Sequence, residues 1–189
     1  VLPIISKKYD IDWFVVYDSQ SKISYDELIQ KHSKDSGIKV IEILLKYRIR
    51  NPKHFFEYLN LCLKIKEKKY DIYYIDLPGL PYFMPLLRLF LNPNKIVIAL
   101  HNVSIPKGAQ NEILSKIYNH FTLSFFTNFH VFSKSQHDYL VDKHKKKKVM
   151  YAPLALKDFG EFNGEKSNEI VFLNFGIIRD YKRIDTLIN

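Results

Sequence analysis

The chain has 189 residues, which allows one domain, or one domain and part of a second. Hydrophobic residues make up 47% of it, enough for a packed core, and this excludes a chain that is disordered throughout. The net charge of +9 favours phosphates, anionic lipid headgroups or other acidic partners, and the single cysteine excludes an intrachain disulfide. No apolar stretch reaches the roughly 18 residues needed to span a bilayer.

Short apolar runs alternate along the chain with longer segments of helical periodicity. The apolar runs predict strands at residues 11–17, 38–45, 71–77, 95–100, 130–132, 148–151 and 169–175. The periodic segments predict helices at residues 24–32, 52–69, 82–91, 111–127 and 133–140. In the helix at 52–69, Cys62 shares an apolar face with Phe55, Phe56, Leu59 and Leu63, which predicts that its thiol lies in the core.

Continuous apolar strands that alternate with helices are typical of a parallel sheet covered on both faces. We therefore expect an α/β fold, a Rossmann-like and mostly parallel sheet with helices on both faces. Residues 1–156 are expected to form this domain, residues 157–168 a linker, and residues 169–189 the beginning of a second domain. In open sheets of this class, ligands bind beyond the carboxyl ends of the strands.

Two residues follow predicted strands directly and are candidates for that edge. His101 comes after the strand at 95–100, where its ring would face a ligand; the alternative is a loop histidine that caps a turn. Ser133 comes after the strand at 130–132 and begins a helix, whose exposed N–H groups could hold an anion. The alternative for Ser133 is simple N-capping by its hydroxyl.

A dense cationic run covers residues 143–148. A solvated loop is one interpretation, and contact with an anionic membrane surface is the other. Nucleic acid is a weaker third choice, because the aromatic residues lie at core spacings and do not form an exposed stacking surface. A nucleic-acid partner is therefore not expected.

The segment at residues 169–189 combines a strand, a tight turn at Gly176 and the start of a helix. Arg179 and Lys182 share this turn, and an arginine can bind a diphosphate through two parallel hydrogen bonds while a lysine adds a point charge. A basic loop with solvated side chains is the alternative. No cofactor motif is present: the chain has no G-x-G-x-x-G after a strand, no Walker loop and no metal-ligand spacing.

The segment at residues 172–188, FLNFGIIRDYKRIDTLI, resembles the opening of the second domain in GT-B glycosyltransferases of family 4. Those enzymes often read F-x-G-x-I-R-x-Y-K-G-x-D-x-L-I there, and Arg183 of this chain stands at the usual glycine. Residues 99–103, ALHNV, are similar to the family's strand and active-site histidine. Residues 130–135 resemble its V-x-S-x-S segment, and residues 149–154 the stretch before its interdomain linker.

The resemblance implies transfer of a sugar from a nucleotide-diphosphate donor to an acceptor, usually with retention and without a metal bound through a D-x-D motif. Arg179 and Lys182 would hold the donor diphosphate, with Gly176 and Ser133 in the same donor-binding set. His101 would be the catalytic residue that faces the donor sugar. The family's first strand would lie before residue 1 and its E-x7-E motif after residue 189, so this piece is expected to be inactive alone.

The sequence thus predicts part of a glycosyltransferase that acts on a glycan or lipid-linked acceptor in surface polysaccharide or glycolipid synthesis. No signal peptide is visible, so we expect a cytoplasmic enzyme at an anionic membrane surface, with no cofactor beyond its nucleotide-sugar substrate. The alternative is a non-catalytic basic α/β module that binds a polyanion. A third possibility is a mere interaction or folding unit.

Overall fold

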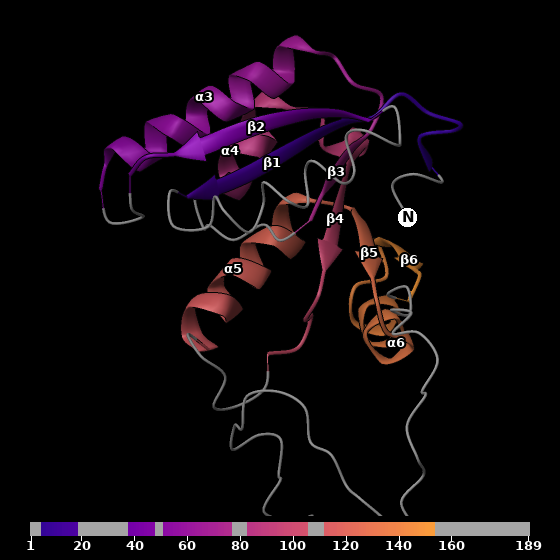
Figure 1. Cartoon of the computed structure of the whole chain (residues 1–189). Helices are drawn as coiled ribbons and strands as arrows, with labels where there is room; N and C mark the ends of the chain where they lie inside the picture. Colours follow the sequence, from indigo (N-terminus) through magenta and orange to yellow (C-terminus); the bar gives the residue numbers. More distant parts are fainter. Residues whose placement is uncertain (1–4, 19–37, 48–50, 77–82, 106–111, 154–189) are drawn as a thin grey trace, which may run out of the picture. The chain divides into compact units, whose positions relative to one another are not determined.

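A computed structural model describes residues 5–18, 38–47, 51–76, 83–105 and 112–153 of the chain (Figure 1). The chain divides into two units, Val1–Tyr73 with Pro78–Ile96 and Tyr74–Leu77 with Val97–Asn189, here called the first and second unit. The predicted helix at residues 24–32, the predicted linker at 157–168 and the predicted second domain at 169–189 lie outside the described residues.

From β2 onward, strands and helices alternate along the described residues, apart from one short 3-10 helix. In chain order the elements are β1 (Asp12–Asp18), β2 (Lys39–Leu45), α3 (Lys53–Glu67), β3 (Tyr73–Ile75), α4 (Phe83–Phe90), η1 (Pro93–Lys95), β4 (Ile96–Leu100), α5 (Glu112–Phe125), β5 (Asn128–Val131), α6 (Lys134–Lys143) and β6 (Lys148–Tyr151). The prediction of an α/β fold with parallel strands is confirmed.

The first unit contains a parallel pair of strands, β1 and β2, in a register that runs from Asp12 opposite Lys39 to Asp18 opposite Leu45. Alternate β1 residues point inward, so Val15 and Tyr17 are buried. The Tyr17 hydroxyl donates a hydrogen bond of 2.5 Å to the Glu42 carboxylate on β2. This contact satisfies the polar end of a buried tyrosine.

Helices α3 and α4 pack together in the same unit, with Leu61, Cys62 and Ile65 of α3 buried. Burial raises the pKa of the Cys62 thiol to about 12, which keeps it protonated at neutral pH. The predicted core position of Cys62 is confirmed. The predicted face around it is wrong, because Phe55 and Phe56 are exposed, and so is Leu63. Helix α3 carries apolar residues all round, and the contact with α4 selects the buried side.

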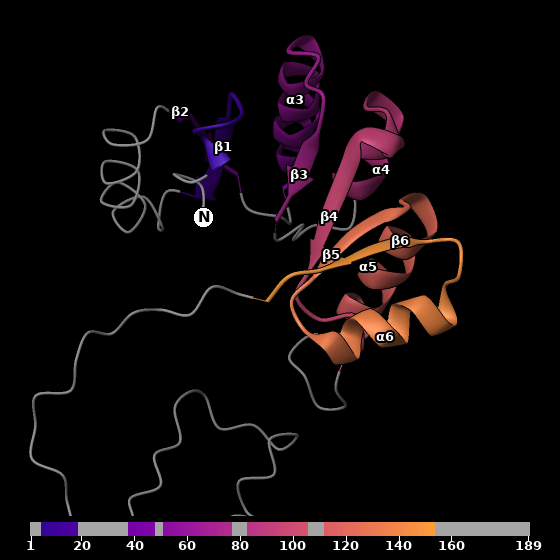
Figure 2. The same ribbon diagram turned by 90° about the vertical axis from the view of Figure 1, so that its right-hand side faces the viewer.

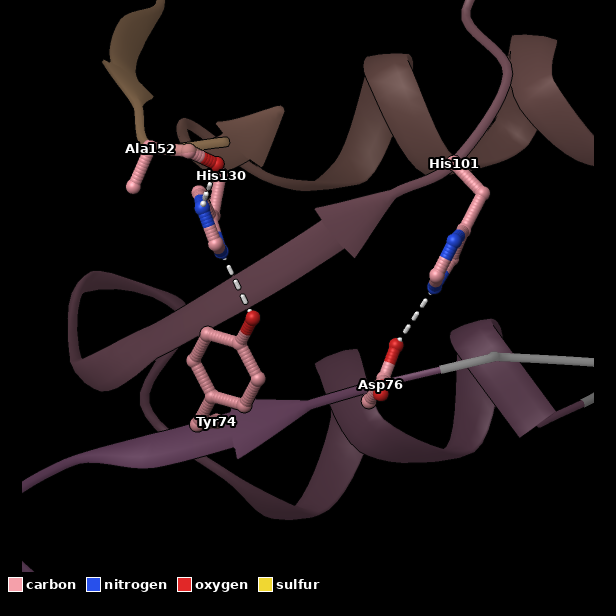
Figure 3. Close-up of polar contacts among 5 residues, drawn as sticks. All are labelled: Tyr74, Asp76, His101, His130 and Ala152. Carbon is pink, nitrogen blue, oxygen red and sulfur yellow. Dashed lines mark hydrogen bonds and ion pairs between the residues drawn. The ribbon is translucent and has the colours of Figure 1, made fainter. Parts of the chain in front are cut away.

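The second unit is built on a four-stranded sheet in the order β3-β4-β5-β6. Strands β4 and β5 are parallel, as are β5 and β6, and the arrows of β3 and β4 point the same way in Figure 3. Helices α5 and α6 each connect one strand to its neighbour in the order β4, β5, β6. Successive right-handed connections of this kind lie on one face of a sheet. Figures 1 and 2 show α5 and α6 on the same face. This face holds the core of the unit, because Ile98, Leu100, Phe129 and Val131 are at most 3% exposed.

The opposite face of this sheet carries polar and half-exposed side chains. Tyr74 of β3 and Met150 of β6 are exposed, and His130 of β5 lies between buried and exposed. Ala99 of β4 pairs in register with His130 and is buried beneath these larger side chains. The sheet therefore presents one apolar face to α5 and α6 and one polar face on the other side.

Two strand boundaries differ from those predicted. Strand β3 covers residues 73–75 and not 71–77, and β5 covers residues 128–131 and not 130–132. Pairing sets the start of β5, because Asn128 lies opposite Val97 on one neighbour and Lys148 on the other. The shorter β3 leaves Asp76 as the first residue after the strand, which matters for the site described next.

Candidate functional site at the carboxyl edge of the sheet

The candidate site lies where the strands of the second unit end. The first residues after β3, β4, β5 and β6 are Asp76, His101, Phe132 and Ala152. Because adjacent strands bring their ends together, these four residues lie along one edge of the sheet. The prediction that His101 directly follows a strand agrees with β4, which ends at Leu100, and its role toward a ligand stays a prediction.

His101 and Asp76 form a hydrogen bond at this edge, with 2.8 Å between His101 Nε2 and Asp76 Oδ1 (Figure 3). The two side chains are 36% and 56% exposed, so a ligand in solvent can reach them. An ionised carboxylate only accepts hydrogen bonds, so Nε2 carries the proton when the imidazole is neutral. The lone pair of a neutral His101 is then on Nδ1, on the other side of the ring.

The backbone that carries His101 is held by two side-chain amides. Gln136 of α6 donates from Nε2 to the His101 carbonyl at 3.0 Å and accepts from the Val103 N–H at 3.3 Å. Asn119 of α5 donates to the carbonyls of Asn102 and Val103, at 2.8 Å and 3.1 Å. Residues 101–103 are therefore tied to both helices beneath the sheet, which limits the motion of the histidine.

Phe132 lies between two histidines on the same face. Its ring centroid is 4.5 Å from that of His101 and 4.5 Å from that of His130. The His101 ring is tilted by only 32° from the Phe132 ring. Phe132 thus restricts the His101 ring from the β5 side, while Asp76 fixes its edge from the β3 side.

His130 is bonded at both ring nitrogens (Figure 3). Its Nε2 is 3.1 Å from the Ala152 carbonyl, which can only accept, so Nε2 donates. The neutral ring then accepts at Nδ1 from the Tyr74 hydroxyl, 2.6 Å away across β4. Partial burial raises the pKa of Tyr74 to about 12, and the nearby Asp76 charge adds to the rise. With both nitrogens engaged, His130 is a structural residue.

Ser133 caps helix α6. Its hydroxyl accepts a hydrogen bond of 3.3 Å from the Gln136 N–H and lies 3.2 Å from the Ser135 hydroxyl. This is the N-capping role expected as the simpler interpretation. The predicted part of Ser133 in donor binding stays a prediction.

The cationic run at residues 143–148 is not uniformly solvated. Lys147 donates to the Phe126 carbonyl at 2.7 Å, and its Nζ lies 6.0 Å from the centre of the Phe129 ring. Partial burial lowers the pKa of Lys147. Lys143 Nζ lies 5.3 Å from the Tyr139 ring, while Lys145, Lys146 and Lys148 are exposed. One lysine of the run therefore supports the fold, and the exposed ones remain open to a partner.

Three predicted donor-binding residues, Gly176, Arg179 and Lys182, lie outside the described residues, and their role stays a prediction. Within the part of the chain that the structure describes, no three His, Cys, Asp or Glu side chains gather in a way that could hold a metal ion. Over the same residues, no helix combines the length and apolar character needed to cross a membrane.

Sequence reasoning missed Asp76 and Gln136. Asp76 was placed inside a predicted strand, although a carboxylate between Ile75 and Leu77 is itself a sign that the apolar run ends there. Gln136 gave no local signal, because its partners are 33 and 35 positions away in the chain. Both residues act on His101, one through its ring and one through its backbone.

Comparison of the chain with protein-family models, with curated proteins and with solved structures finds no match. The α/β fold and the residues at the carboxyl edge are therefore the observations from which a function can be proposed.

Proposed function

We propose that this chain is the acceptor-side part of a glycosyltransferase in surface polysaccharide or glycolipid synthesis. It would move a sugar from a nucleotide-diphosphate donor to a hydroxyl group of a glycan or lipid-linked acceptor. The observation that carries the proposal is the exposed His101–Asp76 pair at the carboxyl edge of a parallel sheet. That edge is where open α/β sheets bind ligands.

The pair can take a proton from a hydroxyl. With Nε2–H bonded to the Asp76 carboxylate, Nδ1 of His101 can accept the proton of an acceptor O–H. The acceptor oxygen then bonds to the anomeric carbon, and the bond from that carbon to the donor phosphate breaks. The nucleoside diphosphate leaves with the electron pair, and Asp76 stabilises the imidazolium that has formed. His101 is thus the proposed catalytic residue and Asp76 a positioning residue.

The leaving diphosphate needs positive charge, and Arg179 and Lys182 are the residues proposed to supply it, with the turn at Gly176. This part of the proposal depends on the family resemblance of residues 172–188. The resemblance implies retention at the anomeric carbon, whereas a single displacement driven by a base inverts it. The anomeric configuration of the product, read by NMR, distinguishes these two courses of the same transfer.

The test uses the full-length protein and a panel of labelled nucleotide-diphosphate sugars with glycan and lipid-linked acceptors. His101→Ala is expected to lower the transfer rate by about 10²–10⁴-fold, the usual effect of removing a general base. Asp76→Asn is expected to lower kcat with little change in KM and to shift the pH profile. Transfer at the wild-type rate by His101→Ala contradicts the proposed role.

His137→Ala is the matched control for these variants. His137 Nδ1 lies 3.0 Å from Asp138, so it is also a histidine beside a carboxylate, but on helix α6 and not at a strand end. Its loss is expected to leave transfer unchanged. For the donor side, Arg179→Ala and Lys182→Ala are expected to weaken nucleotide-sugar binding in calorimetry, and wild-type affinity would refute their role.

A second candidate function is a non-catalytic module that binds a polyanion, and the exposed Lys145, Lys146 and Lys148 favour it. Such a module would bind nucleic acid or another polyanion with a steep dependence on salt. It would show neither transfer nor any response to nucleotide-diphosphate sugars, which separates it from the first proposal.

A further inference from the structure

Four large apolar side chains of helix α5 are exposed. Ile113, Leu114, Ile117 and Phe121 are 76%, 47%, 45% and 40% exposed. At 100° per residue these four positions fall within one arc of the helix surface, here called the apolar ridge. A surface helix of a globular protein usually shows the reverse pattern, with its apolar stripe turned to the core.

The inward side of α5 carries polar groups, among them the buried Tyr118 hydroxyl. Thr122 is fully buried, and its hydroxyl donates to the Tyr118 carbonyl at 2.9 Å. Asn119 bonds the carbonyls of Asn102 and Val103. The helix is therefore attached to its unit through groups other than the apolar ridge, so the ridge residues are available for a separate contact.

A basic turn lies next to the carboxyl end of α5. Lys147 donates to the carbonyl of Phe126, the residue directly after the helix, and the Lys148 N–H bonds the Thr127 carbonyl at 2.8 Å. Lys145, Lys146 and Lys148 are exposed there, and these three residues are here called the lysine turn. Residues 112–153 contain seven lysines and three acidic residues, so this part of the chain carries net positive charge.

We propose that the apolar ridge and the lysine turn together bind the surface of an anionic lipid bilayer. The exposed lysines would face the headgroups, and the ridge would enter the boundary between headgroups and acyl chains. Stable attachment to a bilayer takes two signals, and a few lysines alone are too weak. The positive charge beside the ridge favours lipid over a second copy of this chain, which would carry the same charge.

Co-sedimentation of the full-length protein with phosphatidylcholine vesicles, with and without phosphatidylserine, tests this inference. The protein is expected to bind the vesicles that contain phosphatidylserine. The double variant Ile117→Asp, Phe121→Asp is expected to weaken binding about tenfold or more, because charge is introduced at the buried contact. Leu89→Asp is the matched control, since Leu89 is 75% exposed on α4 of the other unit.

A second measurement avoids variants that fold poorly. In Phe121→Trp, the indole emission is expected to shift to the blue on vesicles and to be quenched by brominated acyl chains, which report insertion. Absence of vesicle binding by the wild type overturns the inference. So does binding that responds to changes at Lys145, Lys146 and Lys148 but not at the ridge.

If something other than lipid covers the ridge, the same variants give a different result, and each such result contradicts the inference. A second copy would appear as a dimer that the ridge variants dissociate. A different segment of this chain would appear as loss of stability in the ridge variants without any vesicle binding by the wild type. The assay needs neither donor nor acceptor, so its outcome is independent of the proposed sugar transfer.

Discussion

The carboxyl edge of the β3–β6 sheet and the outer face of α5 lie in the same unit but differ in how many contacts their side chains make with the rest of the protein. At the edge, polar groups contact one another: His101 bonds Asp76, and Gln136 holds the backbone on which His101 sits. On α5, the apolar ridge faces outward while Thr122 is buried beneath it. A polar edge with satisfied hydrogen bonds is preorganised for a ligand, whereas an exposed apolar ridge gains free energy only when something covers it.

Both features add little to the stability of the fold. The His101–Asp76 pair adds little to stability, because both side chains are exposed and an exposed pair is screened by water. The ridge likewise contributes little, because its apolar area stays in water. Neither feature is needed to hold the unit together, and a function is the simplest reason for each. The predictions below probe whether stability and function really separate in this way.

The largest expected effect is on stability, and it compares a core residue under the helices with a residue of the apolar ridge. Phe129 of β5 is 1% exposed beneath the helices, so Phe129→Ala is expected to lower the free energy of unfolding by about 3–5 kcal/mol. Ile117→Ala on the ridge is expected to stay within about 0.5 kcal/mol of the wild type. Urea unfolding followed by circular dichroism measures both. An equal loss in the two variants would show that the ridge is packed against another part of the protein.

The edge could be predicted from the sequence better than the ridge. The run Ile96–Leu100 followed by His101 predicts a buried strand and a residue at its end, and the structure has both. The hydrogen bond with Asp76 could not be predicted, because it joins residues 25 positions apart and depends on where β3 ends. Local pattern gives the element, and the contacts between elements give its last residue.

The buried side of each helix was harder to predict, for a related physical reason. The helix at residues 111–127 was predicted from its periodicity, and α5 covers 112–125. Its aromatic and aliphatic residues suggest a core face, yet Asn119 bonds the loop after β4, and the buried Thr122 satisfies its hydroxyl on the Tyr118 carbonyl of the same helix. In α3 the same ambiguity exposes Phe55 and Phe56. When a helix is apolar on several sides, only the neighbouring elements determine which side is buried.

An intermediate effect on stability is expected when the side-chain amide of Gln136 is removed. Gln136→Ala removes two hydrogen bonds to the loop after β4, to the His101 carbonyl and from the Val103 N–H. The expected loss of unfolding free energy is about 1–2 kcal/mol. Transfer activity is expected to fall through kcat, because His101 becomes mobile. Gln136→Glu keeps the acceptor for Val103 and is expected to retain more activity than alanine; equal activity in both would argue against the positioning role.

The smallest effect is expected at the polar face, where Tyr74 bonds His130. Tyr74→Phe removes one half-exposed hydrogen bond, so the expected loss at neutral pH is about 0.5–1 kcal/mol. The sign of its pH dependence follows from the pKa of Tyr74, which the fold raises to about 12 from an ordinary value of 10.0. The folded state holds the phenolic proton more tightly, so the contribution is full below about pH 10 and is lost as the pH rises toward 12.

Paired urea titrations of the wild type and Tyr74→Phe at pH 7 and at rising alkaline pH measure this contribution as a difference, in which the other tyrosines cancel. A gap of about 0.5–1 kcal/mol at pH 7 supports the hydrogen bond to His130. A gap that narrows above pH 10 supports the raised pKa of Tyr74, which burial and the Asp76 charge produce. The absence of a gap at pH 7 would mean that the Tyr74 hydroxyl makes no stabilising hydrogen bond. In that case His130 would have an unengaged Nδ1 like that of His101, and the distinction between a structural and a catalytic histidine on this face would fail.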